Sequence, residues 1–586
     1  MKKRIAIVHK DKCNPAACAN LCEKLCPVNR TGSECITIPS KAKIDEVLCT
    51  GCNICSNRCP LGAIEILNLP EALTKPPIHR YGENAFELFS LPAPLFGQVT
   101  GLLGRNGIGK SSAFNILAGL TKPNLGNYEK EETDFKEIIS FFKGTELQKI
   151  LEKIRDKKIV LSYKPQQVDL IPKQFKGTVK QLLKKLDKTN TKDKLNKLVE
   201  ELQLTNFLDT ELSKVSGGEL QRVAIAAATL KKANLYLFDE PSSYLDIKQR
   251  INVSRFIRSL ANDETGVMVV EHDLIIFDYM TDLINIMYGQ PACYGIVSGL
   301  KSTREGINTF LEGQLKEENI RFRSYPIKFE KTQKKEKIKP MPLIAWPEIS
   351  KKLGKFKLGA EAGGLNRNEV IGVLGENGIG KTSFIKILAG LIKPDSGKID
   401  GKLKVAYKPQ YLETESDQLV ADFLKEAVNN YTNQLINPLE VDRLLTKKLS
   451  QLSGGELQKV SIVHCLGQDA DLMLLDEPSA YLDIEQRLLV SKVIKNVTEE
   501  RELTVLIVDH DLMFLDHLSD RLVVFTGTPA KEGLLKGPFN MEEGMNLFLG
   551  DLNISLRRDH NSKRPRINKA GSVKDREQKG KGKLYY

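Results

Sequence analysis

The stretch that decides the fold reads Ser216-Gly-Gly-Glu-Leu-Gln221, followed by an apolar run that ends in Asp239-Glu-Pro241 and then by Tyr244-Leu-Asp246. A second copy of these three segments begins at Ser453, 237 positions further along the chain. Self-similarity at a fixed period indicates a duplicated structural unit. The chain is therefore predicted to contain two equivalent domains.

Each copy follows a glycine-rich loop, Gly104-Arg-Asn-Gly-Ile-Gly-Lys110-Ser111 in the first half and Gly375-Glu-Asn-Gly-Ile-Gly-Lys381-Thr382 in the second. In such a loop the backbone N–H groups surround nucleotide phosphates, the lysine neutralises their charge and the hydroxyl binds Mg²⁺. One loop of this kind recurs by chance, but two loops with the same downstream segments do not. The pattern predicts an α/β fold with two P-loop nucleotide-binding domains of the ATP-binding-cassette type in tandem.

The apolar run from Leu235 to Asp239 predicts a buried parallel strand. Ligands bind at the carboxyl ends of such strands, so this strand would place Asp239 beside the metal. Glu240 follows directly and is positioned to polarise the attacking water.

A glutamine and a histidine complete the predicted chemistry by reaching the metal or water and the γ-phosphate. They are Gln166 in Tyr163-Lys-Pro-Gln166 and His272 in Glu271-His272-Asp273. A single glutamine or histidine of this kind usually has only a structural role. Both recur in the second half, as Gln410 and His510, and this recurrence favours a functional role.

The repeat thus predicts two equivalent sets of site residues. The expected catalytic residues are Glu240, His272 and Gln166 in the first half, and Glu477, His510 and Gln410 in the second. The expected nucleotide-binding residues of the first half are Gly104, Asn106, Gly107, Gly109, Lys110, Ser111, Ser112 and Asp239, with Ser216, Gly217, Gly218 and Glu219. Those of the second half are Gly375, Asn377, Gly378, Gly380, Lys381, Thr382, Ser383 and Asp476, with Ser453, Gly454, Gly455 and Glu456. Magnesium would be bound by Ser111 and Gln166 in one site and by Thr382 and Gln410 in the other.

An aromatic residue that stacks on adenine is harder to find. Tyr81 lies 23 positions before the first loop and suits this role, although it could equally be a core residue. In the second half the candidates are Phe356 and Trp346.

Nine of the eleven cysteines lie within the first 59 residues, in two runs that each end in Cys-Pro. The second run, Cys49-x2-Cys52-x2-Cys55-x3-Cys59-Pro60, has the spacing of a bacterial-type ferredoxin. There, three thiolates bind one four-iron cluster and the fourth binds the other. The looser first run supplies the other ligands, so the predicted sets are Cys13, Cys18, Cys22 and Cys59, and Cys26, Cys49, Cys52 and Cys55.

The alternative to two four-iron clusters is a pair of zinc sites, which usually show two Cys-x2-Cys pairs instead of a run of four. Iron–sulfur is favoured, in a small α+β ferredoxin-like domain. Cys35 belongs to neither ligand set and is expected to be a structural cysteine. Cys293 and Cys465 are expected to be buried and to act as small hydrophobic residues.

Composition excludes several other classes of protein. Hydrophobic residues make up 41% and charged residues 27%, as in globular proteins. No run approaches the roughly 18 apolar residues of a membrane helix. The basic start is followed by an apolar run too short for a signal peptide. We expect a cytoplasmic protein that does not enter a membrane.

The net charge of +13 is concentrated at the C-terminal end. Between positions 555 and 583 there are eleven Lys or Arg residues and three acids, a net +8. This predicts either a solvated, partly disordered tail or a contact with nucleic-acid phosphates.

The expected domains are 1–75 for the iron–sulfur domain, 76–315 for the first cassette, 316–345 for a hinge, 346–545 for the second cassette and 546–586 for a basic tail. The first cassette has extra residues between its loop and Gln166, at about 130–158. Their apolar spacing predicts helix, turn at Gly144 and helix, with Thr145 and Gln148 as a capping box. This basic hairpin is either a decoration or a docking arm.

The chain as a whole resembles the ABC subfamily E ribosome-recycling factors, also called the RNase L inhibitor family. The resemblance rests on the two Cys-Pro runs, both loops, both Ser-Gly-Gly-Glu-Leu-Gln segments, the hairpin and the tail sequence Arg564-Pro-Arg-Ile-Asn-Lys569. It implies a cytosolic ATPase that splits ribosomes after termination or stalling and stays on the small subunit.

The implied partners are the small ribosomal subunit with its rRNA, a class-one release factor or its Pelota-like paralogue, and initiation factors. The resemblance also implies a monomer whose cassettes pack head to tail about a pseudo-two-fold axis. Each ATP would then lie between one phosphate loop and the other half's signature, for example between Lys110 and Ser453.

Two other functions are compatible with parts of the sequence. Ferredoxin spacing permits an ATPase that drives electron transfer, but the sequence offers no second redox site. A transport ATPase with a separate membrane subunit would have no use for iron–sulfur clusters.

Overall fold

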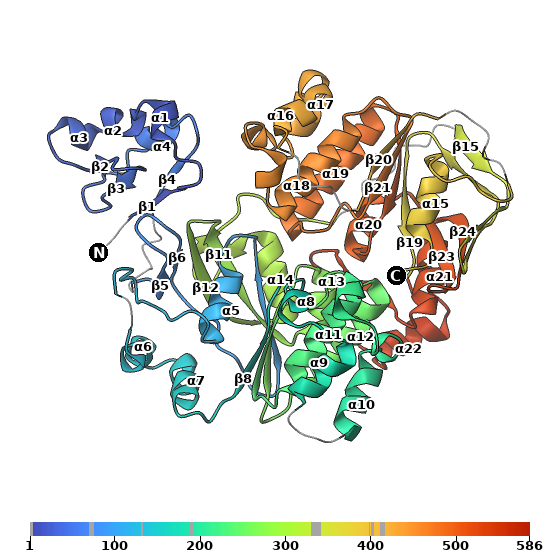
Figure 1. Ribbon diagram of the computed structural model, residues 1–586, viewed down its shortest axis with the longest axis horizontal. Coiled ribbons are helices and arrows are strands. Elements are labelled where there is room, and N and C mark those ends of the chain that lie inside the picture. The colour runs from blue at the N-terminus through green and yellow to red at the C-terminus, as the bar shows by residue number, and fades with distance from the viewer. Residues whose placement is uncertain are drawn as a thin grey trace.

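The computed structural model describes residues 4–68, 76–130, 133–187, 192–329, 341–397, 399, 403–410 and 417–586. They form a small N-terminal domain, two large α/β cassettes and a C-terminal segment (Figure 1). The predicted fold class is confirmed. Among these residues no helix is long and apolar enough to cross a membrane.

The N-terminal domain is α+β. Strand β1 (Arg4–Val8) pairs antiparallel with β4 (Ile64–Asn68), and a second short antiparallel pair is made by β2 (Ile36–Thr37) and β3 (Lys43–Ile44). The helices are short: α1 (Pro15–Cys18), α2 (Leu21–Leu25), α3 (Pro27–Arg30) and α4 (Ile54–Arg58). The apolar core is small and includes six cysteines, so the thiols take the place that larger hydrophobes fill elsewhere.

Each cassette is built on an eight-stranded sheet, and the strands follow the same order in both. The first sheet has the order β5 (His79–Arg80), β6 (Glu87–Leu88), β12 (Tyr294–Ser302), β11 (Leu283–Gln290), β7 (Val99–Gly104), β10 (Gly266–Val270), β9 (Leu235–Asp239) and β8 (Leu161–Lys164). The second has the order β16 (Ile349–Leu353), β17 (Phe356–Ala360), β24 (Glu532–Asn540), β23 (Arg521–Thr528), β19 (Glu369–Leu374), β22 (Thr504–Val508), β21 (Leu472–Asp476) and β20 (Val405–Lys408).

The last five strands of each list are parallel, and the central ones are buried at every position. Burial at every position is why they read as continuous apolar runs. The predicted strand from Leu235 to Asp239 is β9, with the same bounds.

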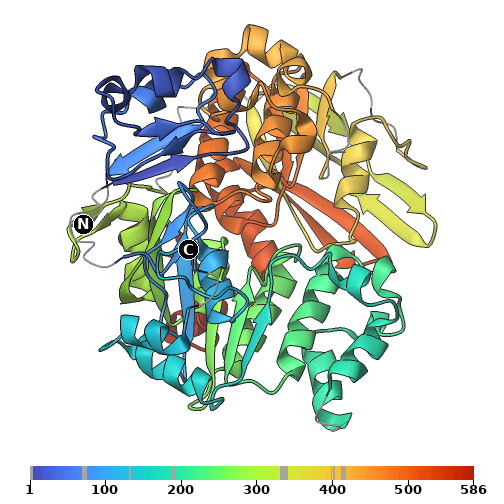
Figure 2. The ribbon, with the colours of Figure 1, turned by 60° about the vertical axis from the view of Figure 1, so that its left-hand side comes forward.

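Helices cover both sheets. In the first cassette they are α5 (Lys110–Leu117), α6 (Phe135–Phe141), α7 (Glu146–Arg155), α8 (Ile171–Gln174), α9 (Val179–Leu186), α10 (Lys192–Glu201), α11 (Gly217–Leu230), α12 (Ile247–Leu260), α13 (Leu274–Met280) and α14 (Thr303–Glu312). In the second they are α15 (Lys381–Leu388), α16 (Val420–Phe423), α17 (Lys425–Asn430), α18 (Gly454–Leu466), α19 (Ile484–Glu500), α20 (Leu512–Leu518) and α21 (Met541–Asp551). Figure 2 shows the two cassettes stacked. The helices α13 and α20 contact each other between them.

The predicted insertion is the helical pair α6 and α7, joined by a turn in which Gly144 has φ 82°. Its apolar side chains, Ile138 and Leu147 among them, belong to the core of the first cassette. The predicted capping box is wrong. Thr145 donates its hydroxyl to the Phe142 carbonyl (2.7 Å), and Gln148 accepts from the Gly144 N–H (2.8 Å), so both side chains stabilise the turn before α7 instead.

The C-terminal segment is ordered as β25 (Leu556–Arg558), β26 (Pro565–Ile567) and α22 (Val573–Gly580). A disordered tail, one of the two alternatives from the sequence, is wrong. Arg564 is fully buried and pairs with Asp278 of α13, because a carboxylate is available there to compensate its charge. Most of the lysine-rich stretch within the predicted hinge lies outside the described residues.

The N-terminal domain is joined to the first cassette through the loop between β5 and β6. Asn84, 2% exposed in this loop, donates to the Ile44 carbonyl (3.0 Å) and accepts from the Ile44 N–H (2.9 Å). Its own carbonyl accepts from the Val8 N–H (3.0 Å). Nearby, Cys293 donates its thiol to Glu65 (3.2 Å).

Candidate active site

The two phosphate loops have the same geometry. Lys110 begins α5, and its ammonium donates to the carbonyls of Gly104 (2.9 Å) and Arg105 (2.8 Å). Lys381 does the same with Gly375 (2.7 Å) and Glu376 (3.0 Å). Burial lowers the pKa of both lysines, that of Lys381 to about 8. A buried cation of this kind is well suited to bind phosphate oxygens.

Glycine is required at Gly109, the residue before this lysine. Its φ is 99°, and a Cβ atom there would lie 2.5 Å from the ring of Phe86. The chain can therefore turn sharply from β7 into α5 only with glycine at this position.

The hydroxyls predicted to hold Mg²⁺ bond the aspartates at the carboxyl ends of β9 and β21. The Thr382 hydroxyl donates to Asp476 (3.1 Å), and Ser111 bonds Asp239 in the same way. Burial raises the pKa of both aspartates. Within the described part of the chain, Asp239 Oδ1 is buried without a hydrogen-bond partner, which fits a cation site.

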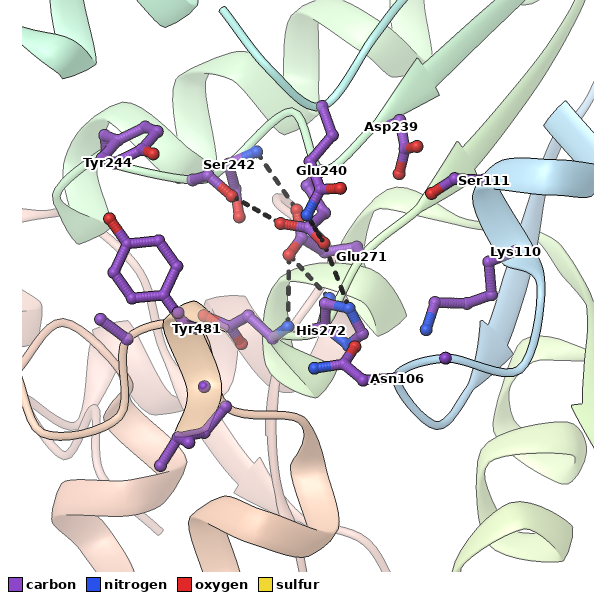
Figure 3. Close-up of a pocket in the computed structure, with 18 of the residues that line it drawn as sticks. Asn106, Lys110, Ser111, Asp239, Glu240, Ser242, Tyr244, Glu271, His272 and Tyr481 are labelled. Atoms are coloured by element: carbon purple, nitrogen blue, oxygen red, sulfur yellow. Dashed lines mark hydrogen bonds and ion pairs between the residues drawn. The ribbon is translucent and has the colours of Figure 1, made fainter. Parts of the chain in front are cut away.

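The two predicted catalytic glutamates are bonded by the predicted glutamines. Gln166 donates to Glu240 Oε1 (2.8 Å), and Gln410 donates to Glu477 Oε1 (2.7 Å). His272 Nε2 lies 3.3 Å from Glu240 Oε1, and His510 Nε2 lies 3.7 Å from Glu477 Oε1. Figure 3 shows Glu240 and His272 facing the side of the cavity on which Lys110 lies. The structure thus brings together, in each half, residues far apart in sequence.

The two glutamates differ in their electrostatic surroundings. Burial opposes the ionisation of Glu240, but hydrogen bonds from His272 and Ser243 and the charge of Lys110 lower its pKa to about 2. Burial and the adjacent Asp476 raise the pKa of Glu477, and the bond from Gln410 only partly offsets this.

The signature segments form the starts of long helices. Ser216 and Glu219 make a capping box at the start of α11, and Ser453 and Glu456 make one at the start of α18. The serine side chain bonds the N–H of the glutamate, and the glutamate bonds the serine N–H (2.9 Å in both). Helix N-termini attract anions, so these ends are suited to contact phosphates.

Contacts between the cassettes bring each phosphate loop to the other half. The Asn106 N–H donates to Asp483 (3.1 Å), and the Asn377 N–H donates to Asp246 (3.0 Å). A cavity of about 670 Å³ between the halves is lined by both, including Lys110 from the first, and Gly454, Gly455 and Tyr481 from the second. Figure 3 shows Tyr481 projecting from the second cassette toward this cavity.

Several residues that position this site were not predicted from the sequence. Asp246 and Asp483 cap α12 and α19 while accepting from the opposite loop, and Gln221 and Gln458 donate to the Glu240 and Glu477 carbonyls (2.6 Å in both). Their recurrence in both halves was the signal that could have identified them.

Of the adenine candidates, Tyr81 is 50% exposed at the rim of the cavity, and its hydroxyl donates to Ser112 (2.9 Å). The alternative of a core residue is therefore wrong for Tyr81. Trp346 is 3% exposed, packs on Phe384 and donates to the Glu361 carbonyl (2.9 Å), which makes it part of the core. Phe356 lies against Gly380, as Phe86 lies against Gly109.

The cysteines of the N-terminal domain gather as two groups. Burial raises the pKa of Cys22 to about 11, with contributions from Cys18, Cys59 and Cys13. Burial likewise raises the pKa of Cys55 to about 12, with contributions from Cys49, Cys52 and Cys22. The neighbours of Cys22 are the other three members of the first predicted set, whereas Cys55 interacts with two members of the second set and also with Cys22 of the first.

Among the described residues no three such side chains already converge as ligands to a single metal ion. Each cysteine of a four-iron cluster binds a different iron atom, so its sulfur need not approach the others so closely. Cysteine thiols are the usual ligands of four-iron clusters, so the residues present fit such clusters. Cys35 lies beside both Cys26 and Cys49, next to the second set.

Comparison with known proteins agrees with this arrangement. Family models match as ABC transporter over residues 95–243 and 362–480, as a possible Fer4-like domain in RNase L inhibitor over 4–34, and as a 4Fe-4S binding domain over 42–65. Translation initiation factor RLI1 of Saccharomyces cerevisiae is 43% identical over 100% of this chain and 98% of its own length. The chain belongs to ABC subfamily E, the RNase L inhibitor family.

Two solved structures of archaeal members of this family are also similar. In a model of ribosome-bound archaeal Pelota and ABCE1, the matching chain has a TM-score of 0.94 and 50% identity, covering 100% of this chain and 99% of that one. In the crystal complex of ribosomal stalk protein aP1 with recycling factor aABCE1, the TM-score is 0.82 at 50% identity, covering 87% and 99%. The chain is thus an ATP-hydrolysing enzyme of the ATP-binding-cassette type with iron–sulfur clusters.

Proposed function

We propose that this chain is an ATP-driven recycling factor that splits ribosomes into subunits after termination or stalling. It acts in the cytoplasm with a class-one release factor or a Pelota-like partner, remains on the small subunit and its rRNA, and meets initiation factors there. The observation that carries the proposal is the likeness, over the whole chain, to the family member bound to the ribosome with Pelota.

In this function each ATP lies between the cassettes. Lys110 and Ser111 share one nucleotide with Ser453 and Gly455, and Lys381 and Thr382 share the other with Ser216 and Gly218. Glu240 and Glu477 polarise the attacking water, and His272 and His510 contact the γ-phosphate. Tyr81 stacks on the first adenine. Binding of ATP draws the halves together about the contacts from Asn106 to Asp483 and from Asn377 to Asp246.

The bound groups complete the site. Mg²⁺, held by Ser111 and Gln166 in one site and by Thr382 and Gln410 in the other, would neutralise charge on the phosphates. Two four-iron clusters, one on each set of four cysteines, would stabilise the N-terminal domain as a rigid body. Closure of the cassettes then moves this body against the ribosome.

Cosedimentation with ribosomal subunits tests the proposal. The chain with a non-hydrolysable ATP analogue should sediment with the small subunit, and should do so less without nucleotide. An ATPase that drives electron transfer predicts no such binding and instead a hydrolysis rate that depends on the oxidation state of the clusters. Absence of nucleotide-dependent binding to the small subunit would contradict the recycling function.

A further inference from the structure

The two predicted active sites differ at one position beside the catalytic glutamate. In the first cassette the Ser243 hydroxyl donates to Glu240 Oε2 (3.1 Å). The equivalent residue of the second cassette is Ala480, which has no hydroxyl. The neighbours on both sides are identical, Ser242 and Tyr244 in one half and Ser479 and Tyr481 in the other.

The backbone does not explain this difference. Glu240 and Glu477 have φ of 47° and 48°, and the tyrosines that follow Ser243 and Ala480 have φ of 64° and 61°. Residues other than glycine rarely adopt such φ values, and the two halves adopt them at equivalent positions. The contrast therefore lies in the side chains alone.

The hydroxyl changes how the carboxylate is held. Both oxygens of Glu240 are engaged, Oε2 by Ser243 and Oε1 by Gln166 (2.8 Å) and His272 (3.3 Å). Glu477 accepts from Gln410 through Oε1 (2.7 Å), and within the described residues Oε2 has no hydrogen-bond donor. His510 stands further off (3.7 Å) and approaches Lys381 (3.4 Å) instead. A carboxylate held at both oxygens has one orientation, whereas one held at a single oxygen can rotate.

We propose that Ser243 is a positioning residue for the first ATP site, whose hydroxyl fixes Glu240 with Oε1 turned toward the attacking water. The inference rests on the proposed role of Glu240. A group that must approach a water molecule in one geometry acts faster when its orientation is fixed beforehand. The second site lacks this restraint, so the two sites are predicted to have different intrinsic rates of hydrolysis.

The test measures ATP hydrolysis without ribosomes. Ser243→Ala is made in the Glu477→Gln background, in which first-site turnover dominates. We expect kcat to fall by about tenfold. A tenfold change corresponds to about 1.4 kcal/mol of transition-state stabilisation, which is typical of one hydrogen bond. KM for ATP should not change, because Ser243 contacts the glutamate and no predicted nucleotide ligand. Ser243→Thr keeps the hydroxyl and should restore most of the rate.

The second cassette supplies the matched control. Ala480→Ser in the Glu240→Gln background adds the missing hydroxyl and should raise the second-site kcat. A thermal unfolding curve for each variant shows whether it is folded. In single turnover, Ser243→Ala should have no further effect once Glu240 is replaced by Ala, because the hydroxyl then has nothing to orient.

Several results would overturn the inference. They are an unchanged kcat in folded Ser243→Ala, an equal loss when Glu240 is absent, and no gain from Ala480→Ser. If Glu240→Ala itself hydrolyses ATP at the parental rate, the role proposed for Glu240 fails. Failure to split ribosomes with normal hydrolysis would instead contradict the recycling function and leave the inference about Ser243 intact.

Discussion

Arg564 of the C-terminal segment and Asp278 of α13 form a buried ion pair of 2.8 Å, with the two side chains 0% and 5% exposed. Asp516 lies at the equivalent position of α20 and accepts from Arg558 (3.2 Å) and Tyr586 (2.8 Å). One segment thus binds the equivalent helices of both cassettes. The helices α13 and α20 begin two residues after the histidines of the two sites, so this segment joins the two helices that follow these histidines.

Arg564→Ala should destabilise the joined cassettes. Removing one partner of a buried ion pair typically costs about 3–5 kcal/mol. The lower end is expected, because Arg566 also donates to Asp278 (3.0 Å). The midpoint of urea unfolding measures the change. Arg557→Ala, an exposed neighbour, is the matched control and should shift the midpoint little. Equal midpoints for the two variants would show that the pair does not stabilise the protein.

Replacing both predicted catalytic glutamates by glutamine should abolish most hydrolysis while ATP still binds. Loss of a general base typically lowers the rate by about 10²–10⁴-fold, and the contacts of Lys110 and Lys381 are untouched. Steady-state hydrolysis and equilibrium nucleotide binding measure the two effects. The double variant should remain on the small subunit after binding. Hydrolysis at the unmodified rate would exclude Glu240 and Glu477 as the bases.

Exposed cations of the C-terminal segment, and not the buried ones, should set the salt dependence of subunit binding. Replacing Arg557, Lys563, Lys569 and Arg576 by Gln should make the plot of log affinity against log salt shallower, by up to about one unit for each phosphate that is no longer neutralised. Binding to purified small subunits over a salt series measures this slope. Arg564→Gln is the contrasting variant. An equally large slope change from Arg564→Gln would contradict its buried placement.

The helical insertion should contribute to ribosome binding through charge. Shortening it would expose the core, since Ile138 and Leu147 are buried with the first cassette. Charge reversal at the exposed Lys136, Lys143 and Lys157 avoids this problem. Affinity for the small subunit should fall at low salt, and ribosome-free hydrolysis should not change. Unaltered affinity at matched salt would make the hairpin a structural decoration.

The two cysteine groups predict different outcomes for two serine substitutions. Cys55→Ser removes a predicted ligand of the second set and, if each set binds one four-iron cluster, should lower bound iron from about eight to about four atoms per chain. Subunit splitting should then fail while ATP still binds. Cys35→Ser, at a buried cysteine beside the same set, should retain the iron. Iron analysis and a light-scattering assay of splitting measure both. Splitting by a chain without this cluster would refute a mechanical role for the N-terminal domain.

The phosphate loops, the signatures, strand β9 and the helical insertion could all be predicted from sequence. Each depends on residues close together in the chain, such as Lys110 after Gly109 or an apolar run before Asp239, and local spacing determines local structure. The recurrence of Gln166 as Gln410 identified both glutamines as site residues, but their hydrogen bonds to Glu240 and Glu477 were not predicted. The repeat supplied evidence that a single copy would not contain.

Only the tertiary structure decided the positions that depend on a distant partner. Arg564 is buried because Asp278, 286 residues earlier in the chain, compensates its charge. From composition alone, Arg564 was expected to lie in a tail exposed to solvent. Trp346 joins the core and Tyr81 lies at the rim of the cavity, although both were candidates for the same role. The contact of Asn106 with Asp483 and the bond of Ser243 to Glu240 likewise required coordinates. Sequence spacing determines which chemical groups are present, but burial and charge compensation depend on which chain segments meet in three dimensions.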